Sequence, residues 1–220
     1  MAKSFGASDI LSALGIDADD WEIQDTGNDE TNDTAVVKTK EGAYVAASDK
    51  AFNHRTEKTI TLKPKDPDGV TASFTLGGAG TAGVVITQFN AKQVNNDYGT
   101  LSVTAHQHDS DDEHLALPLA QAISVTLGFG ILENYLGGAI EDCQSVDLSG
   151  SCEHVDKLGN QGEFLVGAST GLRFECTEEY VDEGSNVSVP SGWFQDSQAV
   201  NSGNEDFVSR SIKAHAYALA

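Results

Sequence analysis

The residues best placed for chemistry lie in one short stretch, VTAHQHDSDDEH (103–114). It holds three of the six histidines of the chain, His106, His108 and His114, together with four carboxylates. In a strand, residues two apart project from the same side, so His106 and His108 share a face. With a third ligand from His114 or a nearby aspartate, they have the donors of a zinc site. The same side chains also suit acid–base chemistry or a pH switch.

A second copy of this pattern favours a structural role for the histidines. DYGTLSVTAHQH (97–108) aligns without a gap with DFVSRSIKAHAY (206–217). The second copy keeps one histidine, His215, but has Tyr217 where the first has His108. A zinc site needs its full set of ligands, so a repeat that keeps one histidine of two indicates packing positions. We therefore predict no bound metal at the three histidines of the first copy, and no cofactor.

The similarity extends to the preceding strands and indicates an internal duplication. FNAKQVN aligns with FQDSQAVN when one inserted residue is allowed. We interpret the chain as two copies of a two-hairpin unit, at about 51–115 and 140–220. Each unit has one apolar sheet face that it cannot bury alone, so two units packed together would bury both faces.

Alternating apolar residues predict strands over most of the chain after residue 50. Four hairpins are expected, namely EKTITLK with VTASFTL across the turn Pro64–Gly69, VVITQFNAKQV with TLSVTAHQH, CQSVDLSGSCEHV with EFLVGASTGLRFEC, and WFQDSQAV with FVSRSIKAHAYAL. TEEYVDEGSNVSVPSG is predicted to be a loop. The predicted fold is mainly β, an antiparallel β-sandwich or barrel in which the two double-hairpin units form one β domain over 51–220.

Residues 1–50 are expected to form a short helix followed by an acidic arm. The helix is predicted at 8–15, where a serine can cap it, three apolar residues share a face and a glycine suits its end. The next segment, DADDWEIQDTGNDETNDT (17–34), is acidic and turn-rich, which predicts an exposed, irregular arm. Trp21 and Ile23 are its only large apolar residues. The arm is either a solvated tail or a segment that docks on a neighbouring subunit.

The charge balance narrows the possible partners. The chain has 13 Lys and Arg against 34 Asp and Glu, a net charge of −21. Such a chain repels phosphate and anionic lipid, which argues against specific nucleic-acid binding and against a membrane surface. The longest uncharged stretch, Leu115–Leu132, alternates apolar with small residues and so predicts a strand rather than a membrane span.

The N-terminal sequence lacks the apolar run of a signal peptide. The three cysteines contain no CxxC pair, which predicts free, buried thiols of a protein made in a reducing cytoplasm. One disulfide, joining Cys143 to Cys152 or Cys176, is the alternative.

No arrangement of residues is typical of catalysis, and we predict that the protein is not an enzyme. There is no Gly-x-Ser-x-Gly elbow. Cys152 and His154 are two apart and can share a strand face, but that spacing suits packing equally well. The acidic clusters lack the ligand spacing of a calcium-binding helix–loop–helix. They either hold a hard cation through loop oxygens or are simply solvated.

Three segments resemble virion proteins of tailed bacteriophages, of the tail tube and tail hub type: HRTEKTITLKPKDPDG, VVITQFNAKQVNNDYGTLSVTAHQH and EDCQSVDLSGSCEHVDKLGNQGEFLVGAST. The resemblance implies a subunit that is assembled in the host cytoplasm and joins copies of itself, and other virion proteins, into rings or a tube. DNA would pass through the acidic channel without binding to it. Capsid decoration and head–tail connection are alternative phage roles.

A different class of function is a β-sandwich binding module for a glycan or a protein. Its aromatic platform would be Trp193 and Phe194 in SVPSGWF. Core packing at the start of a strand is the other interpretation of these two residues.

Self-assembly would use open sheet edges, which invite pairing with another chain. The last predicted strand is guarded only by Arg210 and Lys213. The candidate contact residues between subunits come from this strand and from the acidic arm: Trp21, Ile23, Arg210, Lys213 and Leu219. We expect a homo-oligomeric ring or tube joined by sheet pairing.

Overall fold

The protein is mainly β, as predicted. The computed structural model describes residues 7–33, 36–38, 44–47, 52–66, 70–78, 84–95, 97–108, 122–129, 135–137, 143–158, 164–181, 188–201 and 208–217. These residues form one helix and twelve strands: α1 (Ala7–Ala13), β1 (Trp21–Asp33), β2 (Val36–Lys38), β3 (Tyr44–Ala47), β4 (Phe52–Pro64), β5 (Val70–Leu76), β6 (Val85–Val94), β7 (Asp97–His108), β8 (Ile123–Phe129), β9 (Cys143–Leu158), β10 (Phe164–Val181), β11 (Trp193–Asn201) and β12 (Ser209–Ala216).

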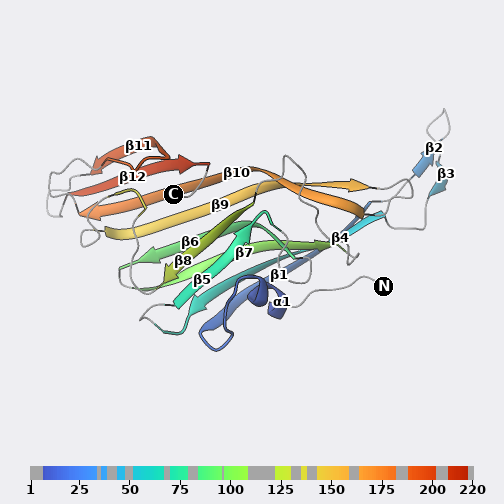
Figure 1. Cartoon of the computed structure of the whole chain (residues 1–220), viewed down its shortest axis with the longest axis horizontal. Helices are drawn as coiled ribbons and strands as arrows, with labels where there is room; N and C mark the ends of the chain where they lie inside the picture. The colour runs from blue at the N-terminus through green and yellow to red at the C-terminus, as the bar shows by residue number, and fades with distance from the viewer. Residues whose placement is uncertain are drawn as a thin grey trace.

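Eight strands form one continuous antiparallel path, in the order β1-β4-β7-β6-β9-β10-β12-β11 (Figure 1). Every neighbouring pair along this path is antiparallel. Strand directions therefore alternate strictly from β1 to β11. We call this path the main sheet. β2 and β3 pair with each other in a separate ladder.

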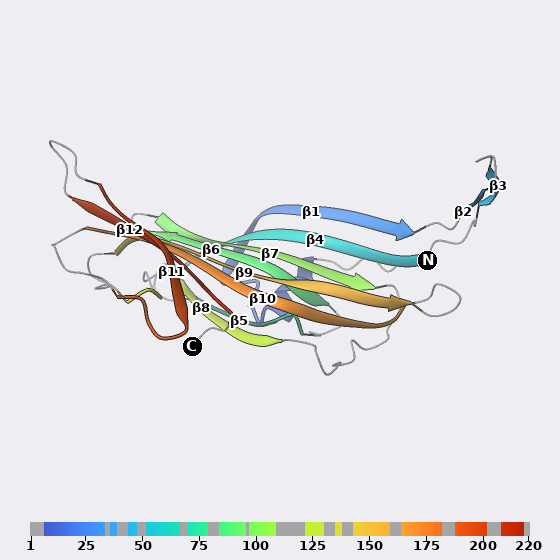
Figure 2. The same ribbon diagram turned by 90° about the horizontal axis from the view of Figure 1, so that it is seen from above.

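A smaller second layer covers part of one face of the main sheet. β5 and β8 pair with each other, and among the described residues the bridge from Leu76 to Ile86 joins them to the main sheet. With α1 they lie on one side of the main sheet (Figure 2). Ring contacts link the layers: Phe74 of β5 meets Phe89 of β6 at 5.3 Å, edge to face. The core lies between these layers, which makes the fold sandwich-like.

The helix forms where it was predicted. Ile10 and Leu14 are fully buried and Leu11 is buried beside them. Gly15 follows with a positive φ of 60°, a conformation that glycine adopts without strain. Ser73 of β5 donates its backbone N–H to the Leu14 carbonyl at 3.2 Å, so the helix end is tied to the second layer.

The acidic arm is not irregular, and the prediction for 17–34 is wrong over most of its length. Trp21–Asp33 is a strand that pairs with β4 from end to end. The sequence did not indicate this strand, because its residues from Glu22 to Asp29 are exposed on both faces of the sheet and therefore show no apolar alternation. Its backbone hydrogen bonds to β4, which do not depend on side-chain type, hold it in the sheet.

Three of the four predicted hairpins are confirmed: β6–β7, β9–β10 and β11–β12. The first is wrong, because β4 pairs with β1 and β7 whereas β5 crosses to the second layer and pairs with β8. The predicted strand inside Leu115–Leu132 is confirmed as β8, whose Val125, Leu127 and Phe129 are buried. The predicted loop that begins at TEEYV is partly wrong, since β10 continues to Val181. Among the described residues, the one helix is too short to cross a membrane.

The hairpins β6–β7 and β11–β12 are two copies of one structure. A β-bulge lies between Ile86 and Gln88 in β6 and between Gln195 and Ser197 in β11. Both pairs differ by 109 residue numbers (195 − 86 and 197 − 88), which is also the offset between 97–108 and 206–217. The two hairpins thus share one register and one bulge position, as two copies of a single hairpin would.

The inserted residue in the alignment of the preceding strands is wrong. Phe89 stands opposite Val103, and the residue opposite Ile212 is Gln198 rather than Phe194. The hairpins correspond without any gap.

The duplication also includes β1 and β4, which correspond to β9 and β10. The bulges of β1 lie between Ile23 and Asp25 and between Thr31 and Asp33, and those of β9 lie between Cys143 and Ser145 and between Ser151 and Glu153. The offset is 120 at both bulges (143 − 23 and 151 − 31). β4 matches β10 with an offset of 118 (173 − 55), since Arg55 is opposite Thr31 and Arg173 is opposite Ser151.

The main sheet is therefore two copies of a four-stranded unit placed side by side. We call β1-β4-β7-β6 the first unit and β9-β10-β12-β11 the second unit. The first unit begins at Trp21, well before the predicted start near residue 51, because the supposed arm is its first strand. The units meet where the last strand of the first, β6, pairs with the first strand of the second, β9.

Candidate functional site: the free edges of the sheet

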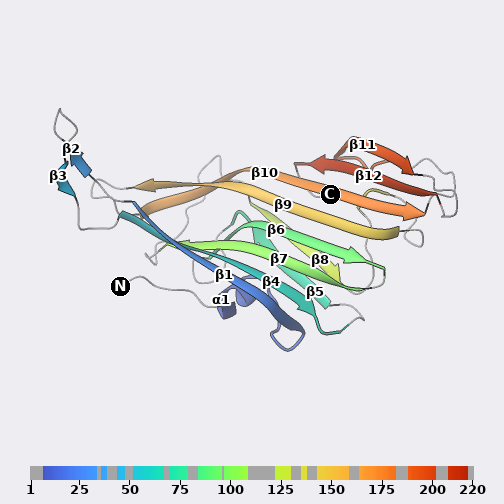
Figure 3. The ribbon, with the colours of Figure 1, turned by 180° about the vertical axis from the view of Figure 1, so that it is seen from behind.

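The two outer strands of the main sheet each have one neighbour. β1 pairs only with β4, and β11 pairs only with β12, among the residues that the structure describes. They lie at opposite ends of the sheet (Figure 3). An outer strand presents a row of backbone N–H and C=O groups that can bond to another chain. These two edges are the candidate functional site.

Bulges limit the length of regular strand at each edge. β1 is regular from Asp25 to Thr31, between its two bulges. β11 is regular from Ser197 to Asn201, beyond the bulge at Asp196. Bulges twist an edge locally and end its pairing. Each edge therefore offers one short regular run.

The two edges differ strongly in charge. β1 contains five carboxylates and no Lys or Arg: Glu22, Asp25, Asp29, Glu30 and Asp33. β11 contains a single charged residue, Asp196. Two β1 edges would place many like charges opposite one another, which is destabilising. A β11 edge meets no such barrier.

An exposed aromatic cluster lies beside the β11 edge. We define the aromatic patch as Phe194 of β11 and His215 and Tyr217 at the end of β12. The Phe194 ring stacks on His215 with centroids 5.4 Å apart, and Tyr217 lies 5.5 Å from His215. The side chains of Phe194 and Tyr217 are 56% and 60% exposed.

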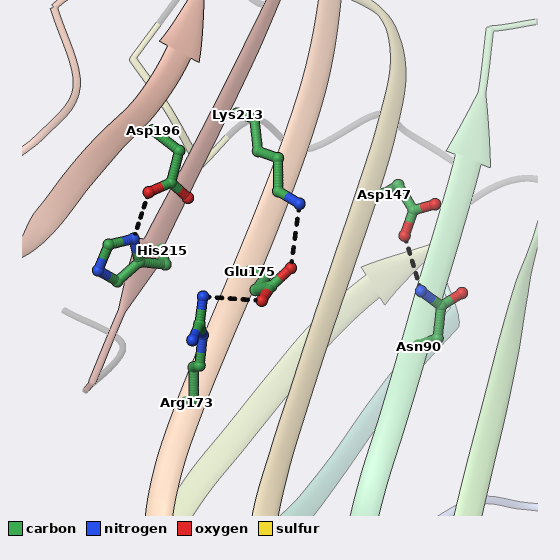
Figure 4. A network of polar contacts seen from close by, with 7 residues as sticks. All are labelled: Asn90, Asp147, Arg173, Glu175, Asp196, Lys213 and His215. Carbon is green, nitrogen blue, oxygen red and sulfur yellow. Dashed lines mark hydrogen bonds and ion pairs between the residues drawn. The ribbon is translucent and has the colours of Figure 1, made fainter.

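Polar contacts fix the strands near the patch (Figure 4). His215 Nδ1 lies 2.7 Å from an oxygen of Asp196, the bulge residue of β11. On the neighbouring strands, Glu175 bonds to Arg173 at 3.0 Å and to Lys213 at 3.3 Å. The contact between Asp196 and His215 holds the imidazole in place next to Phe194.

The predicted contact residues do not gather into one surface. Trp21 is 3% exposed and packs edge to face on Phe129 at 5.0 Å, so it belongs to the core and is not available to a neighbour. Ile23 is exposed on the β1 edge. Leu219 lies outside the described residues. Arg210 is buried in β12 and Lys213 is paired with Glu175, and the prediction that this strand is an open edge is wrong because β12 lies between β10 and β11.

Of the three predicted histidines, the structure describes the side chain of His106 alone. That ring is buried and lies 4.1 Å from the ring of His154 of β9, edge to face. His154 Nδ1 is 3.0 Å from the Ser169 hydroxyl of β10. The side chain of His108 and all of His114 lie outside the described residues. In the described part of the chain, no group of three or more His, Cys, Asp or Glu side chains is arranged to hold a metal ion.

Added zinc is expected to leave the thermal stability of the protein unchanged. A ligand that binds the folded state raises its melting temperature, and in the described part of the chain His106 has no group of further ligands around it that could complete a zinc site. The measurement is the melting temperature with and without equimolar zinc, together with elemental analysis. Stoichiometric zinc that is lost in the variant His106→Ala with His108→Ala would contradict the prediction.

The cysteines are free and poorly suited to nucleophilic chemistry. Cys143 and Cys176 are buried, and all three thiols are unpaired with one another, as predicted. Burial raises the pKa of Cys143 to about 12, with the nearby Glu178 charge adding to the effect. Burial also raises the pKa of Cys152, whose thiol donates to the Thr87 carbonyl at 3.6 Å. Since the thiolate is the nucleophile, these groups are unreactive near neutral pH.

A buried carboxylate, Glu178 of β10, was missed by sequence reasoning. It has no solvent exposure and accepts hydrogen bonds from the backbone N–H groups of Tyr135 and Leu136 and from the Tyr180 hydroxyl. Burial raises its pKa, although these hydrogen bonds oppose the shift. The sequence could have indicated that Glu178 is buried, because it lies between Cys176 and Tyr180 on the inward face of an alternating strand. Its role is to fasten 135–137 to the main sheet.

Comparison with known proteins adds no relative. No protein-family model and no curated protein matches the chain.

Proposed function

We propose that the protein is a virion structural protein of a tailed bacteriophage, a component of the tail-tube type that joins copies of itself through the edges of its main sheet. One observation carries the proposal: the chain already contains an edge-to-edge junction between two copies of one unit, at β6–β9. A unit that can extend a sheet once inside the chain has the geometry to extend it between chains.

The charge supports a role around passing DNA. A net charge of −21 makes the surface repel phosphate, so a channel lined by such subunits would let DNA slide without binding it. Partners are other copies of this chain and other virion proteins, and assembly takes place in the host cytoplasm. Capsid decoration or head–tail connection would use the same edges in a different place in the particle.

Assembly is expected to strengthen with salt. Each subunit of charge −21 repels its copies, and added ions screen this repulsion, with a Debye length of about 30 Å at 0.01 M and about 3 Å at 1 M salt. Size-exclusion chromatography with light scattering, at several protein concentrations, should give larger species in 1 M than in 0.01 M salt. Negative-stain microscopy should then show rings or tubes. A protein that is strictly monomeric in both salts and at high concentration would overturn the proposal.

The aromatic patch supports a second candidate, a binding module for a glycan or a protein. Exposed aromatic rings beside polar side chains are typical of carbohydrate sites. The exposed rings are not the predicted pair of Trp193 and Phe194, however. Trp193 is buried, and Phe194 lies next to Tyr217 instead. Retardation in a glycan-affinity gel, lost in the variant Phe194→Ser, would favour this candidate.

A further inference from the structure

The aromatic patch is exposed at a position that is buried in the first unit. With the offset of 109, Phe194 corresponds to Val85 and His215 to His106, and each pair faces across its hairpin in the same register. Val85 is fully buried and His106 is 4% exposed. The difference comes from β9, which pairs with β6 and brings the His154 ring to 4.1 Å from His106. Beside β11, the described part of the chain has no strand in the place of β9.

We propose that this place is taken by β1 of a second copy. β1 is the first strand of the first unit, as β9 is of the second, and it carries the same two bulges. The junction between subunits would then repeat the β6–β9 junction inside the chain, head to tail, with β11 of one subunit antiparallel to β1 of the next. This inference rests on the proposed self-assembly and specifies which edges meet.

The repeat fixes the register of the junction. Inside the chain, the β6–β9 pairs run from Gln88 opposite Ser151 to Val94 opposite Ser145, and the first five of them end at Lys92 opposite Asp147. Adding 109 to the β6 numbers and subtracting 120 from the β9 numbers places Ser197 opposite Thr31 and Asn201 opposite Gly27. These are the regular runs of both edges, so no bulge interrupts the five pairs.

Backbone hydrogen bonds carry this junction, because its side chains differ from those of the internal one. Inside the chain, Asn90 donates to Asp147 at 2.7 Å across β6–β9. The corresponding residues between subunits are Ala199 and Gly27, which form no such bond. The neighbouring β1 would also cover part of the aromatic patch, since Phe194 lies just beyond the last pair, level with Asp33 of the neighbour.

Repulsion between like charges disfavours a pair of two β1 strands relative to a pair of β11 with β1. Two β1 strands would bring five carboxylates from each side together. β11 brings only Asp196. The acidic edge therefore has a better partner in a β11 edge than in its own copy, which favours head-to-tail growth over closed pairs.

Disulfide trapping tests the register directly. Ala199 and Asp29 are both exposed and stand opposite each other in the proposed junction. Opposed residues of antiparallel strands have Cα atoms about 5 Å apart, within the range of about 4.4–6.8 Å that a disulfide spans. The variant with Ala199→Cys and Asp29→Cys should give, on mild oxidation in high salt, a ladder of covalent dimers, trimers and larger species. The wild type, with its own three cysteines, gives the background.

A mismatched variant is the matched control. Ala199→Cys with Glu22→Cys places the second thiol seven residues along β1, roughly 24 Å from the proposed position. It should give no ladder under the same conditions. An equal ladder from this variant would show random collision and overturn the register.

Other outcomes separate the inference from the proposed function. Dimers from Ala199→Cys alone, or from Asp29→Cys alone, with no ladder from the double variant, would show symmetric pairing and overturn the head-to-tail junction while leaving self-assembly intact. Rings without any crosslink would overturn the junction in the same way. A monomer in light scattering would overturn the proposed function itself.

The contribution of the patch is tested by a pair of aromatic substitutions. Phe194→Ser should lower the yield of the ladder, because its ring lies at the junction. Tyr98→Ser removes a similarly exposed ring from the start of β7, away from both edges, and should leave the yield unchanged. Equal yields from both variants would show that the patch is not part of the junction.

Discussion

Gly150→Ala is expected to destabilise the protein by about 3 kcal/mol, because the position has no room for a methyl group. Gly150 stands in β9 between Phe89 of β6 and Phe174 of β10. An added Cβ would lie 2.4 Å from the Phe89 ring and 2.9 Å from the Phe174 ring, so both rings would have to move. For a chain of this size, the melting temperature should fall by roughly 6–12 °C in calorimetry or circular dichroism.

Gly27→Ala is the matched control, since Gly27 is also a strand glycine. Its nearest neighbour to an added Cβ is Thr59 at 3.9 Å, which is ordinary contact. This variant should match or slightly exceed the stability of the wild type, because alanine reduces the entropy of the unfolded chain. Adding Phe89→Leu to Gly150→Ala should restore part of the loss. A Gly150→Ala protein as stable as the wild type would refute the packing argument.

Glu178→Ala is expected to cost about 3 kcal/mol or more. The substitution removes the acceptor of the Tyr135 and Leu136 N–H groups and of the Tyr180 hydroxyl, in a buried place. Each buried donor left unsatisfied costs about 1–3 kcal/mol. The measurement is urea denaturation at fixed pH. Glu179→Ala, one residue along and exposed, should change stability by less than about 0.5 kcal/mol, and equal losses in the two variants would contradict the prediction.

The same residue gives the protein a pH-dependent stability. Burial raises the pKa of Glu178 above its ordinary value of 4.5. The folded state then holds a proton that the unfolded state has lost, so the free energy of unfolding falls as the pH rises from 4.5 through the folded-state pKa. Glu178→Gln cannot ionise and lacks this contribution. As the pH rises above 4.5, the stability of the wild type relative to Glu178→Gln should therefore decline, and parallel curves would contradict the assignment.

The sequence was informative where strands bury one face. β5, β6, β8 and β12 alternate buried with exposed residues, and their extents followed from that pattern. β1 escaped detection because Trp21 is the one buried residue in the part of the strand whose side chains are described, 21–29, so its composition there resembles that of a loop. A strand that is held by backbone hydrogen bonds alone has no alternation of apolar residues in its sequence from which it can be predicted.

Which strand pairs with which was harder to predict from the sequence than where the strands lie. The turn Pro64–Gly69 was identified correctly as a break, but a break does not say whether the next strand returns to the same sheet. β5 leaves for the second layer because its buried face, including Phe74 and Leu76, packs over the main sheet. The ungapped similarity between 97–108 and 206–217 was the better guide, since it predicted corresponding hairpins, and these hairpins have the same register and the same bulge position.

The sequence likewise indicated the strands that carry the candidate site but not the pairing that brings its residues together. The aromatic patch combines Phe194 with residues of another strand, and only the register of β11 on β12 brings them together. His106 and His154 meet across β6 for the same reason. Sequence spacing placed His106 beside His108, whereas the contact that determines its environment comes from a strand about fifty residues later.

Strand directions alternate strictly in the main sheet, so the way in which units join depends on whether a unit has an even or an odd number of strands. A unit with an even number of strands begins and ends with strands of opposite sense, so the next unit can be added antiparallel without inverting it. An odd-stranded unit would either create a parallel seam or force each new copy to be turned over. The four-stranded unit avoids both. Joining two units in one polypeptide and joining them between polypeptides are then the same geometric operation, and both give the same order and direction of strands.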